Sequence, residues 1–291
     1  MTQRGISSDR PEIVRETVAA HSLGIVEQPL TVWETVWNNA ALRKAVLLVA
    51  LALAWELYAR WLNNPLLVPT FSATVSALWE GLTAGPLLGR AGFSIKVLLM
   101  GYAVGIAIAA LLTAFAVSSS IGTDLLETLT AMFNPLPAIA LLPLALLWFG
   151  LGNPSLIFVM VHSVLWAVAL NTHSGFTSVS NTLRMVGQNC GLTGPRYVLK
   201  ILIPAAFPSI LTGLKIGWAF AWRTLIAAEL VFGVSSGQGG LGWFIYENKN
   251  LLEVPNVLAG LFSVILIGLM VENLVFRNIE GRTVRRWGMQ N

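Results

Sequence analysis

Long apolar runs fill most of the chain beyond residue 42. Six of them are long enough to cross a bilayer as helices, because a hydrocarbon core about 30 Å thick requires about 20 apolar residues. The runs are continuously apolar rather than alternating, which indicates helices and not the strands of a β-barrel. The pattern therefore predicts an all-α, polytopic membrane protein with about six transmembrane helices, at roughly residues 43–62, 93–117, 124–149, 154–174, 205–232 and 255–277.

The first 42 residues differ from the rest of the chain. They are rich in charged residues and contain no long apolar run. A secretory signal has its apolar core within about the first 15–30 residues, so no cleaved leader is expected. Residues 31–42 space valine and tryptophan at helical intervals, which fits an interfacial helix or a helix packed on the protein's own flank. The chain thus divides into a cytoplasmic or interfacial tail, 1–42, and a transmembrane domain, 43–287.

Composition narrows the class further. Hydrophobic residues make up 55% of the 291 residues and charged residues only 11%, whereas soluble domains carry about 25% charged residues. A soluble enzyme, a disordered chain and a coiled coil are therefore disfavoured. The single cysteine, Cys190, excludes an internal disulfide framework and a cysteine-rich zinc motif. The net charge of +4 is modest, and in so apolar a chain it does not indicate nucleic-acid binding.

The distribution of lysine and arginine predicts the orientation. Loops on the cytoplasmic side of membrane proteins carry an excess of these residues. With the N-terminus inside, the outside loops hold only Arg60, Arg90 and Lys249, which nearby glutamates balance. Both termini are therefore expected to be cytoplasmic. The inside segments then hold Arg43, Lys44, Arg184, Arg196, Lys200, Arg277, Arg282, Arg285 and Arg286.

Three apolar segments contain features of their own. Residues 134–137 (Asn-Pro-Leu-Pro) interrupt the third segment, and prolines remove backbone donors, so we expect a kink or break there. The segment is expected in buried structure or on a cavity wall, and Pro137 is a candidate residue of the translocation path. Gly-x-x-x-Gly pairs lie in the second segment, from Gly101 to Gly105, and in the fifth, from Gly213 to Gly217. Such pairs allow helix backbones to approach closely.

A hydrophilic stretch precedes the fifth segment. Pro195 can open a helix at its first turn, and after it an apolar stripe that includes Tyr197 alternates with Arg196 and Lys200, which can face water. We expect either a short cytoplasmic amphipathic helix that a soluble partner can grip or a plain surface loop. The chain is expected to turn sharply at Gly191 with positive φ, whereas Gly194 is expected to accept alanine.

This stretch resembles the cytoplasmic motif of bacterial ABC importer permeases, in the branch for nitrate, sulfonate, taurine and bicarbonate. That motif reads Glu-Ala-Ala, three residues, Gly, nine residues, then Ile-x-Leu-Pro. Here Gly191 is followed by nine residues and then by Ile-Leu-Ile-Pro at 201–204. Isoleucine replaces the motif leucine, and the Glu-Ala-Ala positions hold Met185, Val186 and Gly187, so the acidic residue is absent.

Two other stretches are similar to the same family. One is the proline-rich region 135–144 with the Trp-Phe-Gly-Leu-Gly run at 148–152. The other comprises 211–217 with Ala-Ala-Glu at 227–229, and the Gly-Gly-Leu-Gly turn at 239–242 is similar too. The resemblance covers roughly residues 43–287.

The resemblance implies the fold and the partners. It implies a type I ABC importer permease fold in the bacterial inner membrane, with a second permease subunit expected to be another copy. It also implies two ABC ATPase subunits and a periplasmic or lipid-anchored solute-binding protein, besides membrane lipid. The solute is expected to be a small anion: nitrate, a sulfonate such as taurine, bicarbonate or an organic acid. The coupling helix is expected near 187–200, with ATPase-contact residues Gly187, Gly191, Gly194, Pro195, Arg196, Tyr197, Lys200 and Pro204.

The chain carries no Gly-x-x-x-x-Gly-Lys-[Ser/Thr] phosphate loop. We therefore expect it not to be an enzyme and to bind no cofactor and no metal, with ATP-Mg used by the partner subunit.

Ionisable residues inside apolar spans are costly and point to function. Arg223 can draw an anion along the path with Glu229, or it can pair structurally with Glu229 or Glu272. Trp218 and Trp222 share a helix face, where they can stack an organic solute or pack against lipid or another subunit.

Further ionisable residues lie in or near the spans. His162 is a proton relay or a hydrogen-bonded packing residue, and Lys215 is expected to extend toward the cytoplasm.

Two rival functions have sequence requirements of their own. An ion-coupled secondary transporter uses buried carboxylates and often inverted repeats, and few carboxylates and no repeat are evident. An intramembrane serine protease needs a serine–histidine contact, for which Ser94 in a Gly-Phe-Ser tripeptide and the histidines His162 and His173 are the candidates.

Overall fold

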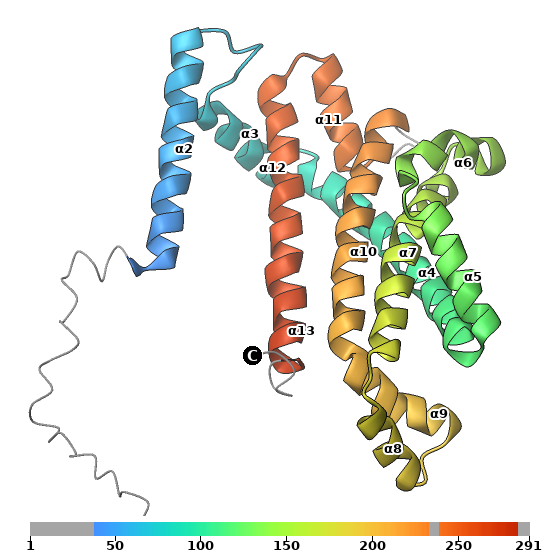
Figure 1. Cartoon of the computed structure of the whole chain (residues 1–291). Helices are drawn as coiled ribbons and strands as arrows, with labels where there is room; N and C mark the ends of the chain where they lie inside the picture. The colour runs from blue at the N-terminus through green and yellow to red at the C-terminus, as the bar shows by residue number, and fades with distance from the viewer. Residues whose placement is uncertain (1–37, 233–238, 285–291) are drawn as a thin grey trace, which may run out of the picture. The chain divides into compact units, whose positions relative to one another are not determined.

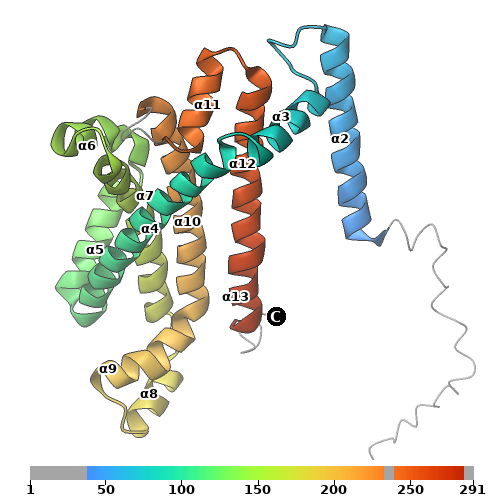
Figure 2. The ribbon, with the colours of Figure 1, turned by 180° about the vertical axis from the view of Figure 1, so that it is seen from behind.

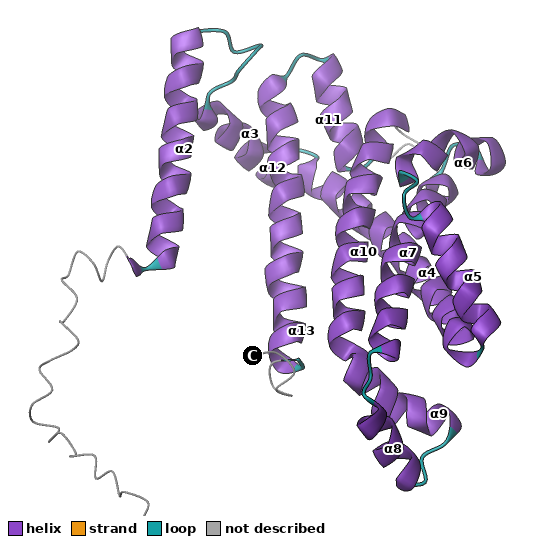
Figure 3. Ribbon diagram, viewed as in Figure 1, coloured by secondary structure: helices purple, strands orange, loops and turns teal. Residues whose placement is uncertain are grey.

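The computed structural model describes residues 38–232 and 239–284, and every regular element in these ranges is helical (Figures 1 and 3). The all-α prediction is confirmed. Residues 1–37 of the predicted tail lie outside the described residues, as do Arg285 and Arg286. In chain order the α-helices are α2 (Ala40–Leu62), α3 (Phe71–Thr83), α4 (Leu87–Ser118), α5 (Ser120–Phe133), α6 (Leu142–Phe149), α7 (Asn153–Thr177), α8 (Asn181–Asn189), α9 (Gly194–Tyr197), α10 (Ile203–Phe232), α11 (Leu241–Asn250), α12 (Val254–Val271) and α13 (Arg277–Arg282).

Three short segments have other helical geometries. The 3₁₀-helix η2 (Ala138–Leu141) precedes α6, and the π-helices η3 (Val198–Leu202) and η4 (Glu272–Phe276) lead into α10 and α13. The chain divides into two units, residues 1–54 and 55–291, and the second contains the helix bundle.

The membrane-spanning helices follow the predicted segments. Four helical runs in the described ranges are long and apolar enough to cross a membrane: Leu87–Ser118, Asn153–Thr177, Val198–Val231 and Val254–Arg282. A fifth span is obtained if the pair Ser120–Phe133 and Ala138–Phe149, bent by 87°, is counted as one. The break expected at residues 134–137 is thereby confirmed. The first predicted segment, 43–62, forms α2, which is not one of these runs, so its crossing stays a prediction.

The sequence did not reveal α3 and α11, which fall in stretches interpreted as outside loops. Both are short, and α11 ends in the polar run Glu-Asn-Lys-Asn. The start of α3 has a local cause, because the Thr70 hydroxyl accepts a hydrogen bond from the Ala73 backbone N–H at 3.2 Å.

Helix α7 packs between α4 and α10 (Figure 2). Both Gly-x-x-x-Gly pairs face it, which confirms the expected close packing. A Cβ atom added at Gly105 of α4 would lie 2.7 Å from the Val164 Cβ, and one added at Gly213 of α10 would lie 2.8 Å from the Asn171 Cβ. Backbones at this separation leave no room for a side chain.

These contacts predict a stability difference within one helix. Gly105→Ala is expected to destabilise the protein by about 1–3 kcal/mol, because the β-branched Val164 cannot move aside without strain. Gly92→Ala in the same helix is the matched control, since an added Cβ there meets no atom within 4 Å. Thermal unfolding of both variants in detergent measures the difference, and equal midpoints would contradict the packing assignment.

Candidate functional site

A helical hairpin extends from one end of α10, formed by α8, a turn, and α9 continuing through η3 (Figure 1). Two contacts fix its start. The Ser180 hydroxyl accepts from the Leu183 N–H, and the Arg184 guanidinium donates to the carbonyl oxygens of Phe176 at 2.6 Å and Val179 at 3.1 Å. The α8–α9 hairpin, residues 181–202, is thus tied to the end of α7 and is continuous with α10.

Gly191 ends α8 in a left-handed cap. Its φ is 71°, the N–H of Leu192 donates to the Gly187 carbonyl at 3.1 Å, and its own N–H donates to the Gln188 carbonyl at 2.9 Å. These two bonds form a Schellman motif, in which a residue in the left-handed region closes the helix. The positive φ expected at Gly191 is confirmed.

Gly194 corrects an expectation. Its φ is 56°, so it also lies in the left-handed region, where alanine is strained. The interpretation of this position as compatible with alanine was therefore wrong. The region 187–200, expected to be one coupling helix, is instead the end of α8, a turn and the start of α9–η3, because both glycines reverse the chain.

Gly187 lies where the two arms of the hairpin meet. A Cβ atom there would come within 2.9 Å of the Tyr197 ring and 3.0 Å of the Ile201 side chain, so the arms touch only because this position has no side chain. Pro204 falls in the first turn of α10.

The outer surface of the hairpin exposes apolar and cationic side chains together. Exposed apolar side chains are normal where lipid covers them, but here they neighbour two cations. The exposed members of this surface are Leu183, Met185, Val186, Arg196, Leu199 and Lys200.

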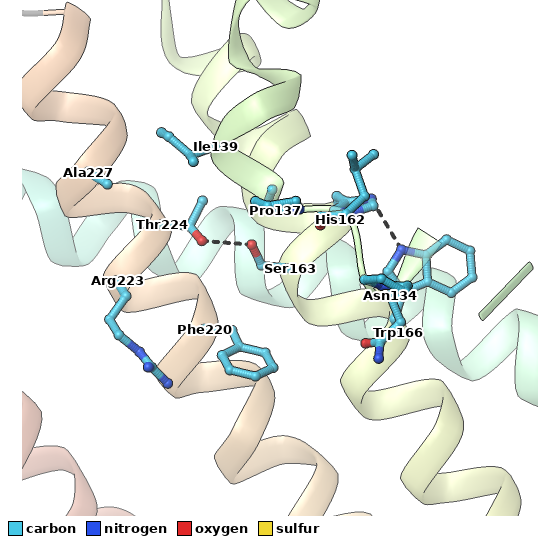
Figure 4. Close-up of a pocket in the computed structure, with 13 residues that line it drawn as sticks. Asn134, Pro137, Ile139, His162, Ser163, Trp166, Phe220, Arg223, Thr224 and Ala227 are labelled. Atoms are coloured by element: carbon cyan, nitrogen blue, oxygen red, sulfur yellow. Dashed lines mark hydrogen bonds between the residues drawn. The ribbon is translucent and has the colours of Figure 1, made fainter. Parts of the chain in front are cut away.

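A cavity of about 340 Å³ lies between α10, α7 and the broken segment before α6 (Figure 4). Two of the predicted path residues, Arg223 and Pro137, line it. The Arg223 Nε donates to the Ala219 carbonyl at 3.0 Å, and its guanidinium carbon lies 5.2 Å from the centre of the Phe220 ring. Arg223 forms no ion pair with any residue in the described ranges.

Four other polar side chains of the cavity wall, those of Ser163, Thr224, His162 and Trp166, are already partnered. The Ser163 and Thr224 hydroxyls are 2.9 Å apart, and the Trp166 indole donates to His162 Nδ1 at 3.1 Å. An indole N–H only donates, so Nδ1 carries no proton, and Nε2 faces the Leu136 carbonyl at 3.3 Å. His162 is thus a neutral, hydrogen-bonded packing residue rather than a free relay.

Glu229 lies away from this cavity and is buried, with 2% of its surface exposed. Both carboxylate oxygens are 2.9 Å from the Ser94 hydroxyl of α4, and one accepts from the Gly242 N–H at 2.8 Å. The Ser94 oxygen in turn accepts from the Leu241 N–H at 2.9 Å. Glu229 therefore anchors the start of α11, and the alternative of an Arg223–Glu229 pair is wrong.

The second structural alternative for Arg223 is also wrong. Glu272 lies 3.9 Å from the Lys215 Nζ, and Lys215 also pairs with Glu280. Lys215 thus reaches toward α13, at the end of the bundle that carries the hairpin (Figure 1).

Trp218 and Trp222 do not line the Arg223 cavity either. Trp218 packs edge-on against Tyr102 at 5.4 Å between ring centroids, and the buried Trp222 donates from Nε1 to the Val264 carbonyl at 3.2 Å. Both tryptophans pack within the bundle.

The residues proposed for a serine protease do not form a site. The Ser94 hydroxyl bonds to Glu229 and Leu241, whereas the His162 ring bonds to Leu136 and Trp166. No group of three or more metal-ligating side chains occurs in the part of the chain that the structure describes.

Sequence reasoning missed several residues of both sites. Phe220, Thr224 and Ala227 were missed, although with the predicted Arg223 they follow the i, i+3, i+4, i+7 spacing of a single helix face, which the sequence could have revealed. No feature of the sequence around Ser94 or Glu229 identified the two residues as partners.

The chain is similar to membrane components of transport systems. A family model described as a binding-protein-dependent transport system inner membrane component matches residues 101–287. A protein of Methanocaldococcus jannaschii named as an ABC transporter permease is 34% identical over 240 residues, covering 81% of this chain and 89% of the relative. A protein of Escherichia coli named as an aliphatic sulfonates transport permease is 27% identical, over 82% of this chain and 89% of its own. A nitrate import permease of Synechocystis is 26% identical, over 82% and 88%.

Proposed function

Because the chain belongs to the family of binding-protein-dependent transport system inner membrane components, we propose that it is the permease subunit of an ATP-driven importer for a small anion. The observation that carries the proposal is the α8–α9 hairpin. It contains the glycine-to-proline spacing of the family's cytoplasmic motif, and its second arm is continuous with α10. We place the protein in the bacterial inner membrane, with the hairpin and both termini in the cytoplasm.

The hairpin is suited to transmit force to the cavity. Its second arm continues without a break into α10, and Arg184 joins its first arm to the end of α7. Helices α7 and α10 both contribute side chains to the Arg223 cavity. A partner that pulls on the hairpin therefore moves two walls of that cavity.

The partner in this proposal is an ABC ATPase subunit, one for each of two permease copies. The exposed apolar and cationic side chains of the hairpin form its contact, and ATP-Mg stays in the ATPase. A solute-binding protein delivers the anion from the outer side. Arg223 attracts the anion in the path, because it is a guanidinium with no carboxylate partner among the described residues.

A charge placed on the hairpin tests the ATPase contact. Leu199→Asp is expected to abolish copurification of the ATPase and ATP-driven uptake. Leu199 is 64% exposed, and in the proposed contact an aspartate at this position would place an unpaired charge in a desolvated interface. Gly281→Asp in α13 is the control, because Gly281 lies at the end of the bundle that carries the hairpin and an added Cβ there meets no atom within 4 Å. Normal ATPase binding and transport by Leu199→Asp would contradict the proposal. Uptake driven by an ion gradient without ATP would favour the secondary transporter.

Topology provides an independent prediction. Reporter fusions after Leu62 and Asn250 are expected to lie outside, and fusions at the C-terminus inside, because lysine and arginine concentrate in the segments assigned to the cytoplasm. Alkaline phosphatase and fluorescent-protein fusions measure this directly. A periplasmic C-terminus would overturn the assigned orientation.

A further inference from the structure

We infer that the Arg223 cavity accepts a monovalent organic anion, one with an apolar body and no cationic group, in preference to a small inorganic oxyanion. The inference rests on the proposed function and narrows its solute class. The names of the relatives leave this choice open, because a sulfonate permease and a nitrate permease match the chain over equal shares of its length.

The charge of the cavity sets the charge of the ligand. Among the described residues that line the cavity, Arg223 is the sole charged side chain. Its Nε is bonded to Ala219, and its two terminal nitrogens form no hydrogen bond with a described residue. A guanidinium presents such nitrogens as a fork that matches a carboxylate or sulfonate. One unpaired positive charge fits one negative charge.

The same lining disfavours a zwitterion. None of the described lining residues is an aspartate or a glutamate, so an ammonium group would lose water there and meet only neutral acceptors such as the Asn134 amide oxygen, with no carboxylate to balance its charge. His162 offers no acceptor to such a group, because Nδ1 already accepts from Trp166 and Nε2 faces the Leu136 carbonyl. Taurine differs from a simple alkanesulfonate by this ammonium group, and it therefore serves as a discriminating probe.

The remaining wall is suited to an apolar body. The cavity volume of about 340 Å³ falls in the range of about 300–1,000 Å³ that is usual for organic ligands. A bare three-oxygen anion beside the guanidinium would leave most of this wall uncovered. The apolar lining comprises Pro135, Leu136, Pro137, Ala138, Ile139, Phe220 and Ala227.

Two affinity trends follow from this geometry. Each methylene added between methanesulfonate and butane-1-sulfonate is expected to raise affinity by about two- to fourfold, as it buries against the apolar wall. Arg223→Gln is expected to reduce butane-1-sulfonate affinity by about tenfold or more, and Arg223→Lys by less, because lysine keeps the charge and loses the fork.

A thiol-protection experiment tests the inference on the permease alone, without ATP. The chain has one cysteine, so Cys190→Ser with Ala227→Cys places a single thiol on the cavity wall. The rate of N-ethylmaleimide labelling in membranes is measured against the concentration of each sulfonate, taurine and nitrate. The native chain is the control, because its Cys190 is exposed on the hairpin and does not line the cavity. If the Arg223 variants, without added anion, are labelled at the same rate as the parent Cys190→Ser, Ala227→Cys chain, they are folded.

Protection by butane-1-sulfonate that strengthens with chain length and is lost in Arg223→Gln supports the inference. Equal protection by nitrate or taurine at the same concentration overturns it, as does the absence of protection by every probe. ATP-driven uptake of an anion by the reconstituted complex reports separately on the proposed function, so either result can fail while the other stands.

Discussion

Glu229→Ala is expected to destabilise the permease by about 2–6 kcal/mol, because it leaves two buried donors without an acceptor. These donors are the Ser94 hydroxyl, 2.9 Å from the carboxylate, and the Gly242 N–H at 2.8 Å. Bulk water does not reach the native carboxylate, since Glu229 is 2% exposed and the turn at residues 240–242 packs against it. A Cβ added at Gly240 would collide with the glutamate oxygen. Chemical or thermal unfolding in detergent measures the loss.

Neighbouring substitutions separate this network from a general effect of removing charge. Glu229→Gln is expected to cost less, because its amide oxygen can still accept from Gly242. Glu247→Ala in α11 is the matched control. The Glu247 carboxylate pairs with Arg90 at 3.4 Å in a partly exposed position, and ion pairs of this kind contribute about 0–1 kcal/mol to stability. Equal unfolding midpoints for Glu229→Ala and the native protein would contradict the anchoring role.

Features that act locally could be predicted from the sequence. The prolines at residues 134–137 remove backbone donors wherever they occur, and the structure breaks there by 87°. Glycine pairs four residues apart expose a strip of bare backbone, and both pairs pack against α7. Gly191 could be recognised because a sharp turn at the motif glycine implies a positive φ, and its φ of 71° agrees.

Features that depend on distant segments could not be predicted. Ser94 and Glu229 are 135 residues apart in sequence, so neither residue signals the other. An arginine and a glutamate six positions apart in one helix invited a local pair, but the fold gives each side chain a different environment. Gly194 looked compatible with alanine, since a sequence does not state a backbone angle. Short polar helices such as α11 lack the apolar length that identifies a span.

Gly191→Val is expected to uncouple the proposed complex while leaving the permease in the membrane. Valine at a φ of 71° is strained by about 1–3 kcal/mol, and relieving the strain opens the Schellman cap that sets the angle between the hairpin arms. This strain energy is small compared with the free energy of inserting several apolar helices into the membrane. It is large enough to shift a coupling equilibrium about tenfold, so ATP hydrolysis should no longer respond to loaded binding protein.

Matched substitutions make this prediction specific to the backbone angle. Gly191→Asn is expected to keep most coupling, because asparagine adopts the left-handed region more readily than other residues with side chains. Gly194→Ala is expected to be intermediate, since alanine at a φ of 56° costs about 1–2 kcal/mol and lacks the β-branch. Space is not the cause at either position, because an added Cβ meets no atom within 4 Å. Normal stimulation of ATP hydrolysis in Gly191→Val, at equal membrane abundance, would show that the angle between the arms does not matter for coupling.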